Sequence, residues 1–570
     1  MAAEVEEAPA GGAEEIKPYK IHVSSKYLDL TKQKLEVTRL PHELSEPKSK
    51  DWWEPKSRVE PLIDFWLEQY SWRTQEDLLN TELPQFRTGF LASSSEATVR
   101  IHFVHARSSH SNAIPLLLIP PFPFSNLSFG HLVKLFTDPE DVSNNQPFHL
   151  VIPSLPGVGF SDALPNNTPV ISSTAEILNS LMSRLSYPHY LVTNAGSGAA
   201  SPAEIDFKLV NCLATYYSGS CLGAHLISPP LAQPRLREAP VEWAKWSIAN
   251  LFHAPILGYR SEDFSALERN GYVRPSKKAP TPTQFGINQL GLREPNTLAY
   301  ALCDSPTGLL VFVMKLLRLL GHKKEFTPTE TINLTQLAWL PGPEAAMRFW
   351  AHCVRHPEMV EKKTSSKPRV GITVFLGDEP DTNEIGEGGA EAVVEAGDSV
   401  ENEARDCYTC PSWANAKYNV IYTNRASGKS GLLAWERPEI IAAGIRGVAS
   451  SILRWDSRLR QSPAPTTAPL EQVVVHSDTA GEQPAPAPTK PAPALLVPPS
   501  RGERAQPHRQ LSDETAVGSS PGENVAGKTP SPGSKVPSPS HLAPPTDEGT
   551  HPRRETSDDT AVEQPSKEGA

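Results

Sequence analysis

Short apolar runs bounded by turn residues occur in the first half of the chain, and they restrict its fold more than any other feature. The runs PLLLIP (115–120) and HLVIPSL (149–155) are typical of buried parallel strands, and TVRIHFVH (98–105) alternates like a half-buried strand. Helical stretches separate these runs. This alternation predicts an α/β fold with a parallel sheet, whose functional site lies at the carboxyl ends of the strands.

The pattern changes at about residue 232, because helical spacing replaces strands over residues 232–361. Such a block predicts a helical cap inserted over the sheet. A strand at 369–377, a strand at 418–423 and an amphipathic helix at 437–455 then complete the core. The acidic, Gly-rich residues 381–406 predict a solvated surface insertion.

The two ends of the chain differ in composition from this folded part. Residues 1–16 are small and acidic, and Ser462–Ala570 is crowded with Pro, Ser, Thr, Ala and Gly. Both segments are expected to be disordered, because they cannot bury enough apolar surface to offset their ordering entropy. Near the amino-terminal end, apolar residues recur at helical spacing through residues 61–80, which predicts one helix.

Charge and hydropathy exclude several functional classes. The net charge of −11 argues against nucleic acid as a partner, because phosphate binding requires a basic surface. No stretch reaches the roughly 18–20 apolar residues that cross a bilayer, so no membrane span is expected. The six cysteines suit a reducing compartment. We therefore expect a soluble, cytoplasmic protein.

Several strings, in this order, resemble epoxide hydrolases of the microsomal and juvenile-hormone type, over about Tyr19 to Leu459. The first are SWRTQEDLLNTELPQFRT (71–88) and IHFVHARS (101–108), which resemble the amino-terminal domain that wraps the core. The others are the loop GVGFSDALP (157–165), the cap helices EPNTLAYALCDSPTGLLVFVMKLL (294–317) and the last helix GLLAWERPEIIAAGIRG (431–447). The resemblance implies an α/β-hydrolase fold, with a mainly parallel sheet, an amino-terminal wrapping segment and an inserted helical cap.

The resemblance also sets the expected domain boundaries. They are a disordered amino terminus (1–18), an epoxide-hydrolase-type amino-terminal domain (19–110), the first part of the core (111–230), the helical cap (231–365), the second part of the core (366–461) and a disordered Pro/Ser-rich tail (462–570).

The family's chemistry requires side chains that this sequence lacks. An aspartate on a sharp turn attacks the epoxide, a histidine paired with an acid activates water, and two cap tyrosines donate to the opening oxygen. The resemblance places Gly196 at the nucleophile, Gly431 at the histidine and Trp350 at one cap tyrosine. Asp378 occupies the acid position. The second tyrosine falls near Phe285, with Tyr272 and Tyr300 as alternatives.

The oxyanion loop of the family, His-Gly-x-Pro, aligns with Pro120–Pro123. Phe122 and Pro123 keep the aromatic and proline positions, and the backbone amide of Phe122 remains as a donor, whereas the histidine and glycine are replaced. Phe122, Pro123, Phe124 and Ser197 are the expected oxyanion and pocket residues. Together with Trp350, the aromatic residues predict a pocket for a hydrophobic small molecule.

A second register makes Ser197 the nucleophile, because Ala195–Ala199 also fits the small-x-Ser-x-small elbow of esterases. A serine nucleophile requires a histidine late in the core, and none occurs between Pro357 and Val475. A serine esterase would therefore depend on another base, such as Lys429.

Two histidine and cysteine patterns have both a structural and a functional interpretation. His352, Cys353 and His356 have helical spacing that suits a metal, but no third ligand motif accompanies them, so cap packing or surface exposure is the default. Cys407 and Cys410 have redox spacing without the strand-to-helix context of that chemistry. We expect neither a metal nor a cofactor.

Three functional hypotheses follow. The leading one is a pseudoenzyme that retains the family's fold and a capped hydrophobic pocket. The second is an active hydrolase, either an epoxide hydrolase with displaced catalytic groups or an esterase using Ser197. The third is a scaffold that recruits protein partners through the tail, where KTPSPGSKVPSPS (528–540) suits a proline-directed or SH3-type site. The oligomeric state does not follow from the sequence.

Overall fold

A computed structural model describes the regions of the chain that form the core and the cap. They are residues 15–43, 54–91, 97–165, 168–196, 201–270, 294–321, 323–356, 358, 366–378 and 408–461. The chain divides into two units, Met1–Gln472 and Val473–Ala570, and every described residue belongs to the first. The expected acidic insertion (381–406) and Pro/Ser-rich tail (462–570) lie outside the described residues, as do residues 1–14 of the expected disordered amino terminus.

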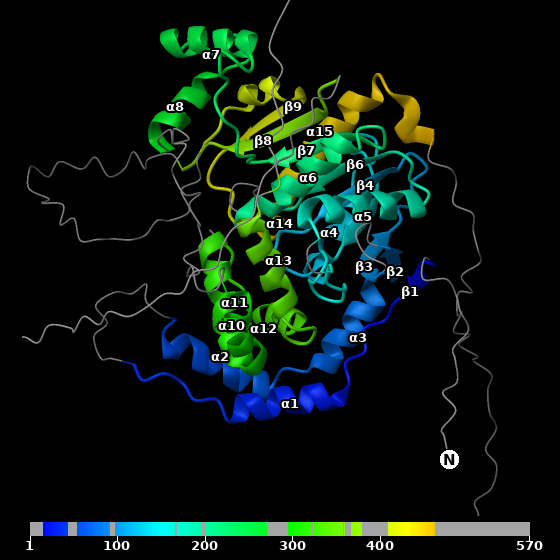
Figure 1. Cartoon of the computed structure of the whole chain (residues 1–570), viewed down its shortest axis with the longest axis vertical. Helices are drawn as coiled ribbons and strands as arrows, with labels where there is room; N and C mark the ends of the chain where they lie inside the picture. The colour runs from blue at the N-terminus through cyan, green and yellow to red at the C-terminus, as the bar shows by residue number, and fades with distance from the viewer. Residues whose placement is uncertain are drawn as a thin grey trace, which may run out of the picture. The chain divides into compact units, whose positions relative to one another are not determined.

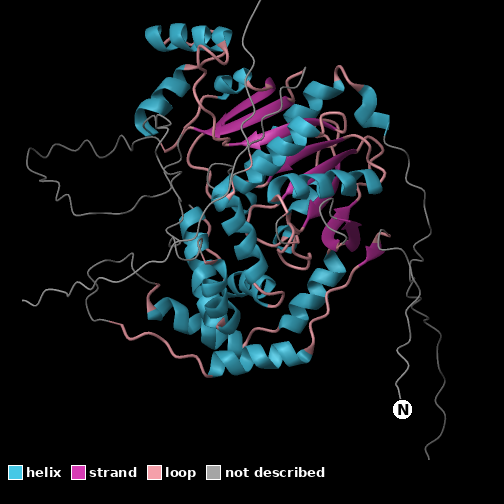
Figure 2. Ribbon diagram, viewed as in Figure 1, coloured by secondary structure: helices cyan, strands magenta, loops and turns pink. Residues whose placement is uncertain are grey.

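A nine-stranded sheet forms the centre of the first unit, in the order β1-β2-β3-β5-β4-β6-β7-β8-β9. Pairing is antiparallel from β1 to β5 and parallel from β5 to β9, as Figure 2 shows in magenta. The mostly parallel sheet confirms the predicted fold class. The strands are β1 (Lys17–Pro18), β2 (Gln85–Leu91), β3 (Thr98–Ala106), β4 (Ile114–Ile119), β5 (Phe148–Pro153), β6 (Tyr190–Asn194), β7 (Cys221–Ile227), β8 (Arg369–Phe375) and β9 (Asn419–Ala426).

Strand β3 is more deeply buried than its alternating sequence predicts. Ile101 and Phe103 pack into the core on one face, as expected, but His102 on the other face is also fully buried. The ring of Tyr19 lies edge-on to His102 at a centroid distance of 5.2 Å, and Gln85 hydrogen-bonds to its Nε2 at 3.1 Å. The prediction of a half-buried strand was therefore wrong, because the amino-terminal segment covers the second face.

Helices pack on both faces of the sheet. Apolar residues of α5 (Val170–Arg184) and α6 (Ile205–Tyr216) join one core cluster, and those of α4 (Leu132–Thr137) and α15 (Pro438–Leu453) join the other. Helix α15 lies so close to the sheet that a Cβ on Gly444 would be 2.1 Å from His225 Nε2. Coverage of both faces explains why the central strands have continuous apolar sequences.

The described residues between β7 and β8 form helices and no strand, as the sequence predicts. Helices α10–α13 pack against one another below the sheet in Figure 1, and α7 and α8 lie apart from them near β9. None of the described helices alone has the length and apolarity to cross a membrane, and α10 and α11 satisfy both only as a pair bent by 114°. The helices are α7 (Pro240–Phe252), α8 (Ser261–Asn270), α10 (Pro295–Asp304), α11 (Pro306–Leu320), α12 (Pro328–Trp339) and α13 (Glu344–Arg355).

The amino-terminal segment contains α1 (Ser25–Glu36), α2 (Lys56–Glu68) and α3 (Trp72–Glu82). The prediction of one helix over residues 61–80 was wrong, because Ser71 interrupts it and caps α3 by accepting a hydrogen bond from the Thr74 amide. The apolar residues keep helical spacing across the gap between α2 and α3, so the spacing alone did not reveal the end of one helix and the start of the next.

Helices α1, α2 and the turn before α3 lie against the cap in Figure 1. Several hydrogen bonds join the two regions, including Thr38 Oγ1 to Thr307 Oγ1 at 3.0 Å, Tyr70 OH to Asn333 Oδ1 at 2.6 Å and Trp339 Nε1 to Thr31 Oγ1 at 2.9 Å. The same segment supplies β1 and β2 to the sheet edge. It therefore connects the cap to the core.

Candidate functional site

A small cavity of about 20 Å³ lies where β4 and β6 end, and we call it the elbow cavity. Gly196 follows β6 on one side, and Gly431 lies in the loop before the last core helices. The structure therefore brings together the two positions that the sequence assigned to nucleophile and base. The lining residues are Pro121, Phe122, Ala195, Gly196, Ser201, Pro202, Asp206, Leu320, Gly431, Leu432, Leu433, Ala434 and Trp435.

Glycine at both positions leaves the elbow cavity without the family's reactive side chains. The backbone at Gly196 approaches the oxyanion loop closely, since a Cβ there would lie 2.9 Å from Pro121 Cβ. Gly431 adopts φ 57°, a conformation that favours glycine. Local packing at Gly196 and backbone conformation at Gly431 therefore both disfavour a larger residue.

Asp206 faces this cavity from the first turn of α6, and sequence reasoning missed it. Its side chain is 1% exposed. Oδ1 accepts a hydrogen bond from the Phe122 amide at 3.1 Å, and Oδ2 has no hydrogen-bond partner within the described part of the chain. Oδ2 also lies 3.6 Å from the point where a Cβ on Gly196 would be. The carboxyl group thus occupies space beside the missing nucleophile.

Burial raises the pKa of Asp206 to about 7, and the hydrogen bond from the Phe122 amide and the nearby Ser201 hydroxyl oppose this shift. No other ionisable side chain belongs to the described lining of the elbow cavity. A sequence signal for Asp206 did exist, because it precedes Leu209, Val210 and Leu213 at the helical spacing of the buried stripe. A carboxylate on such a stripe is rare without a functional or structural role.

A second cavity, of about 60 Å³, lies between the core and the cap, and we call it the cap pocket. Phe122 lines both cavities, stacking on Phe349 of α13 at a centroid distance of 5.6 Å and meeting the edge of Trp350 at 6.4 Å. The predicted pocket residues Phe122, Pro123, Phe124 and Trp350 all lie in its wall. The full lining is Phe122–Ser125, Gly157–Gly159, Leu302, Leu309, Phe312, Val313, Leu316, Leu334, Leu337, Ala338, Gly342, Pro343, Ala346, Met347 and Trp350.

Other predicted site residues lie elsewhere. Asp378 is exposed after β8, where it lines an open surface cleft with Lys323, Lys324 and Arg437, and it does not line the elbow cavity. Tyr300 on α10 is 81% exposed and does not line the cap pocket. Three candidates, Ser197, Tyr272 and Phe285, lie outside the described residues.

No histidine or lysine lines either cavity among the described residues. His131 lies behind the elbow cavity, where its Nε2 donates to the Ala434 carbonyl at 2.8 Å and its ring stacks on Trp435. Lys429 precedes Gly431 by two residues and does not line the cavity. The described lining of the two cavities therefore lacks a histidine or lysine base, and Asp206 is its one ionisable side chain.

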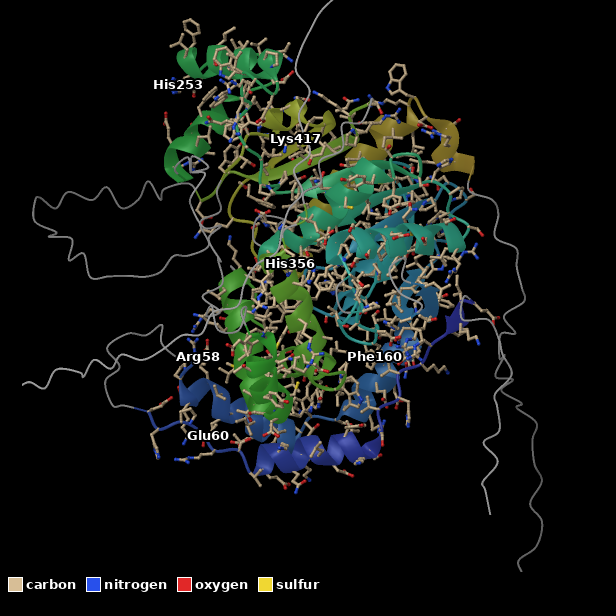
Figure 3. All side chains as sticks on the ribbon, in the orientation of Figure 1. Arg58, Glu60, Phe160, His253, His356 and Lys417 are labelled. Atoms are coloured by element: carbon tan, nitrogen blue, oxygen red, sulfur yellow. The ribbon has the colours of Figure 1, made fainter. Side chains whose placement is uncertain are left out.

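Among the described residues, the histidines and cysteines with metal-like or redox-like spacing lie at the end of α13 or in buried positions. His352 and His356 lie at the end of α13 with ring centroids 4.7 Å apart, and Figure 3 labels His356 where this helix reaches the core. Cys353 is buried, which raises the pKa of its thiol to about 12. Cys410 is also buried, and Cys407 lies outside the described residues. The described part of the chain contains no group of three metal-ligating side chains.

Similarity to known proteins agrees with this architecture. The family model described as epoxide hydrolase N terminus matches residues 16–129. A Stigmatella aurantiaca protein named "Putative epoxide hydrolase" is 30% identical over 447 residues, covering 76% of this chain and 84% of the relative. Juvenile hormone epoxide hydrolase 1 of Ctenocephalides felis is 27% identical, over 53% of this chain and 59% of its own length.

Two solved structures share the fold. The Aspergillus niger epoxide hydrolase and the juvenile hormone epoxide hydrolase of Bombyx mori each superpose with a TM-score of 0.56 at 19% sequence identity. They cover 78% and 77% of this chain, and 98% and 95% of the solved chains. A mostly parallel sheet with a helical cap over its strand ends defines an α/β-hydrolase. The sequence relationship is more specific, and the chain belongs to the epoxide hydrolase family.

Proposed function

We propose that this chain binds an apolar small molecule in the cap pocket and does not turn over epoxides by the family's two-step hydrolysis. The observation that carries the proposal is the absence of a side chain at both Gly196 and Gly431, two positions that line the elbow cavity. Two-step hydrolysis needs a carboxylate nucleophile and a base that activates water. When catalytic residues act as one unit, loss of one of them removes most of the rate that the whole unit supplies.

The cap pocket favours a small, apolar ligand. Its wall is aliphatic and aromatic apart from Ser125 and backbone groups. A volume of about 60 Å³ exceeds that of one water molecule, yet it is less than half of the roughly 150 Å³ cavity that holds benzene. A ligand of more than a few heavy atoms therefore has to displace lining side chains, and unbranched Met347 can adjust most readily.

Turnover and binding are tested on the same purified full-length protein. We expect no diol from a panel of aromatic, terpenoid and short aliphatic epoxides, and a rise in unfolding temperature with short alkanols or alkyl ethers of increasing chain length. Binding without turnover supports the proposal. Multiple turnovers of any epoxide would contradict it, and so would a complete lack of stabilisation across the series.

Ala338→Leu is expected to weaken binding of these compounds on the order of tenfold or more, because the added carbons occupy the cap pocket. Ala338→Ser changes polarity at nearly constant size and is the matched control. Titration calorimetry measures the affinity, and the unfolding temperature without ligand verifies that both variants fold. Equal affinity of the Leu variant and the wild type would place the ligand elsewhere.

A further inference from the structure

The carboxyl group of Asp206 has the arrangement that a carboxylate nucleophile requires. One oxygen, Oδ1, is held by the backbone amide of Phe122 at 3.1 Å, in the loop that follows β4. The other, Oδ2, has no hydrogen-bond partner in the described structure and points to the space above Gly196. An amide that holds one oxygen both orients a carboxylate and stabilises the carbonyl oxygen of an ester formed through the other.

We infer that Asp206 supplies the nucleophile that Gly196 lacks, and that it forms an ester with a small terminal epoxide in a single stoichiometric reaction. This inference goes beyond the proposed function and rests on it only for delivery of the epoxide through the cap pocket. The residue comes from α6 and not from the turn after β6. Its Oδ2 lies 3.6 Å from the point where a Cβ on Gly196 would be, which is within van der Waals contact of the family's nucleophile position.

The reaction is a ring opening without a redox change. Oδ2 of ionised Asp206 attacks the less substituted ring carbon, so the ester carbon–oxygen bond forms while the ring carbon–oxygen bond breaks. The electron pair passes to the ring oxygen, which takes a proton from a water molecule, and the resulting hydroxide is neutralised by the buffer. The product is a hydroxyalkyl ester whose carbonyl oxygen stays on the Phe122 amide.

The reaction is expected to stop at this ester. Hydrolysis needs a base that removes a proton from water, and the described lining of the elbow cavity has Gly431 at the base position and no ionisable side chain besides Asp206. One label per chain is therefore the expected stoichiometry. Multiple turnovers to diol are not expected.

Access limits the size of the electrophile. The elbow cavity of about 20 Å³ holds roughly one water molecule, and the ring of Phe122 belongs to its wall and to that of the cap pocket. A short, unbranched epoxide such as 1,2-epoxybutane can enter after a small shift of this ring, whereas a bulky aromatic epoxide cannot. Labelling by 1,2-epoxybutane is expected to be faster than labelling by styrene oxide.

The test treats the full-length protein with 1,2-epoxybutane and measures its intact mass and peptide map. We expect one added epoxide mass on the peptide that contains Asp206, and its removal by hydroxylamine, which cleaves esters. Alkylated cysteine, including the exposed Cys303, forms a thioether that hydroxylamine does not cleave. The hydroxylamine step therefore separates carboxyl labelling from thiol labelling.

Asp206→Asn is expected to lose the label, and Glu204→Gln, which removes a partly exposed carboxyl group two residues earlier, is expected to keep it. Labelling of the wild type is also expected to accelerate by an order of magnitude or more from about pH 5.5 to about pH 8, since burial raises the pKa of Asp206 to about 7. Should the Asn variant fail to fold, the mapped, hydroxylamine-sensitive label on the wild type still decides the matter.

Each outcome has one meaning. An ester on Asp206 supports the inference. No ester on a folded protein that binds the matching alkanol overturns it and leaves Asp206 as a structural acceptor for the Phe122 amide. Multiple turnovers to diol that require Asp206 would support its nucleophilic role while overturning the stoichiometric limit and the proposed function.

Discussion

Raising the pH from about 5 to about 8 is expected to destabilise the wild-type protein relative to its Asp206→Asn variant by about 2–3 kcal/mol. The pKa of Asp206 is raised from the ordinary value of 3.8 to about 7 in the folded protein. The unfolded chain ionises this carboxyl group near pH 4, whereas the folded chain keeps it protonated until about pH 7. Stability from this group is therefore fully present below pH 4, falls between pH 4 and 7, and does not change further above pH 7.

Urea unfolding of both proteins at the two pH values measures this difference. The wild type's own change with pH includes many other groups, so the comparison with the Asn variant isolates residue 206. Glu204→Gln is the control, because it removes a nearby carboxyl group that is not fully buried. Parallel pH dependence in the wild type and the Asn variant would show that Asp206 is ionised at pH 5 in the folded protein.

Arg425→Met is expected to lower the free energy of unfolding by about 3–5 kcal/mol. Arg425 on β9 makes a two-pronged ion pair with Asp263 on α8, with Nε–Oδ1 2.6 Å and Nη2–Oδ2 2.8 Å. Side-chain exposure is 3% for Arg425 and 0% for Asp263, and Tyr408 OH donates a further hydrogen bond to Asp263. Removing the cation leaves a buried carboxylate without its counter-charge.

The double variant Arg425→Met, Asp263→Leu is expected to lose less stability than Arg425→Met alone, because neither charge then remains buried. Denaturant unfolding measures the free energies, and limited proteolysis reports on the α8 region. Since α8 joins the sheet through this pair, cleavage of the single variant is expected to begin between α7 and α8. Equal stability of the single variant and the wild type would contradict the prediction.

The sequence predicted several residues that line the two cavities. Gly196 and Gly431 were assigned through the family resemblance, and the structure puts both on one cavity. Phe122 and Trp350 were likewise expected to line a pocket and do so. Phe122 and Gly196 are predictable because short loops hold them near the carboxyl ends of β4 and β6, whereas Gly431 and Trp350 were found only through their resemblance to family motifs.

The residues that escaped prediction depend on geometry that no single motif encodes. Asp206 reaches the elbow cavity only because the first turn of α6 has a particular rotation, which no residue spacing in the sequence encodes. Asp378 follows the end of β8 as expected, but the turn after the strand leaves its side chain exposed. Rotation of a helix and direction of a turn are set by tertiary packing.

The contacts of the amino-terminal segment have a consequence for the release of a ligand bound as proposed. Its strands extend the sheet edge, and Thr31, Thr38 and Tyr70 hydrogen-bond to the cap helices that line the pocket. Because this segment is bound both to the cap and to the sheet, movement of the cap away from the core requires these hydrogen bonds to break. For a ligand bound as proposed, release from the cap pocket is therefore expected to require detachment of the amino-terminal segment from the cap, so two ligands of very different affinity are expected to leave at similar rates.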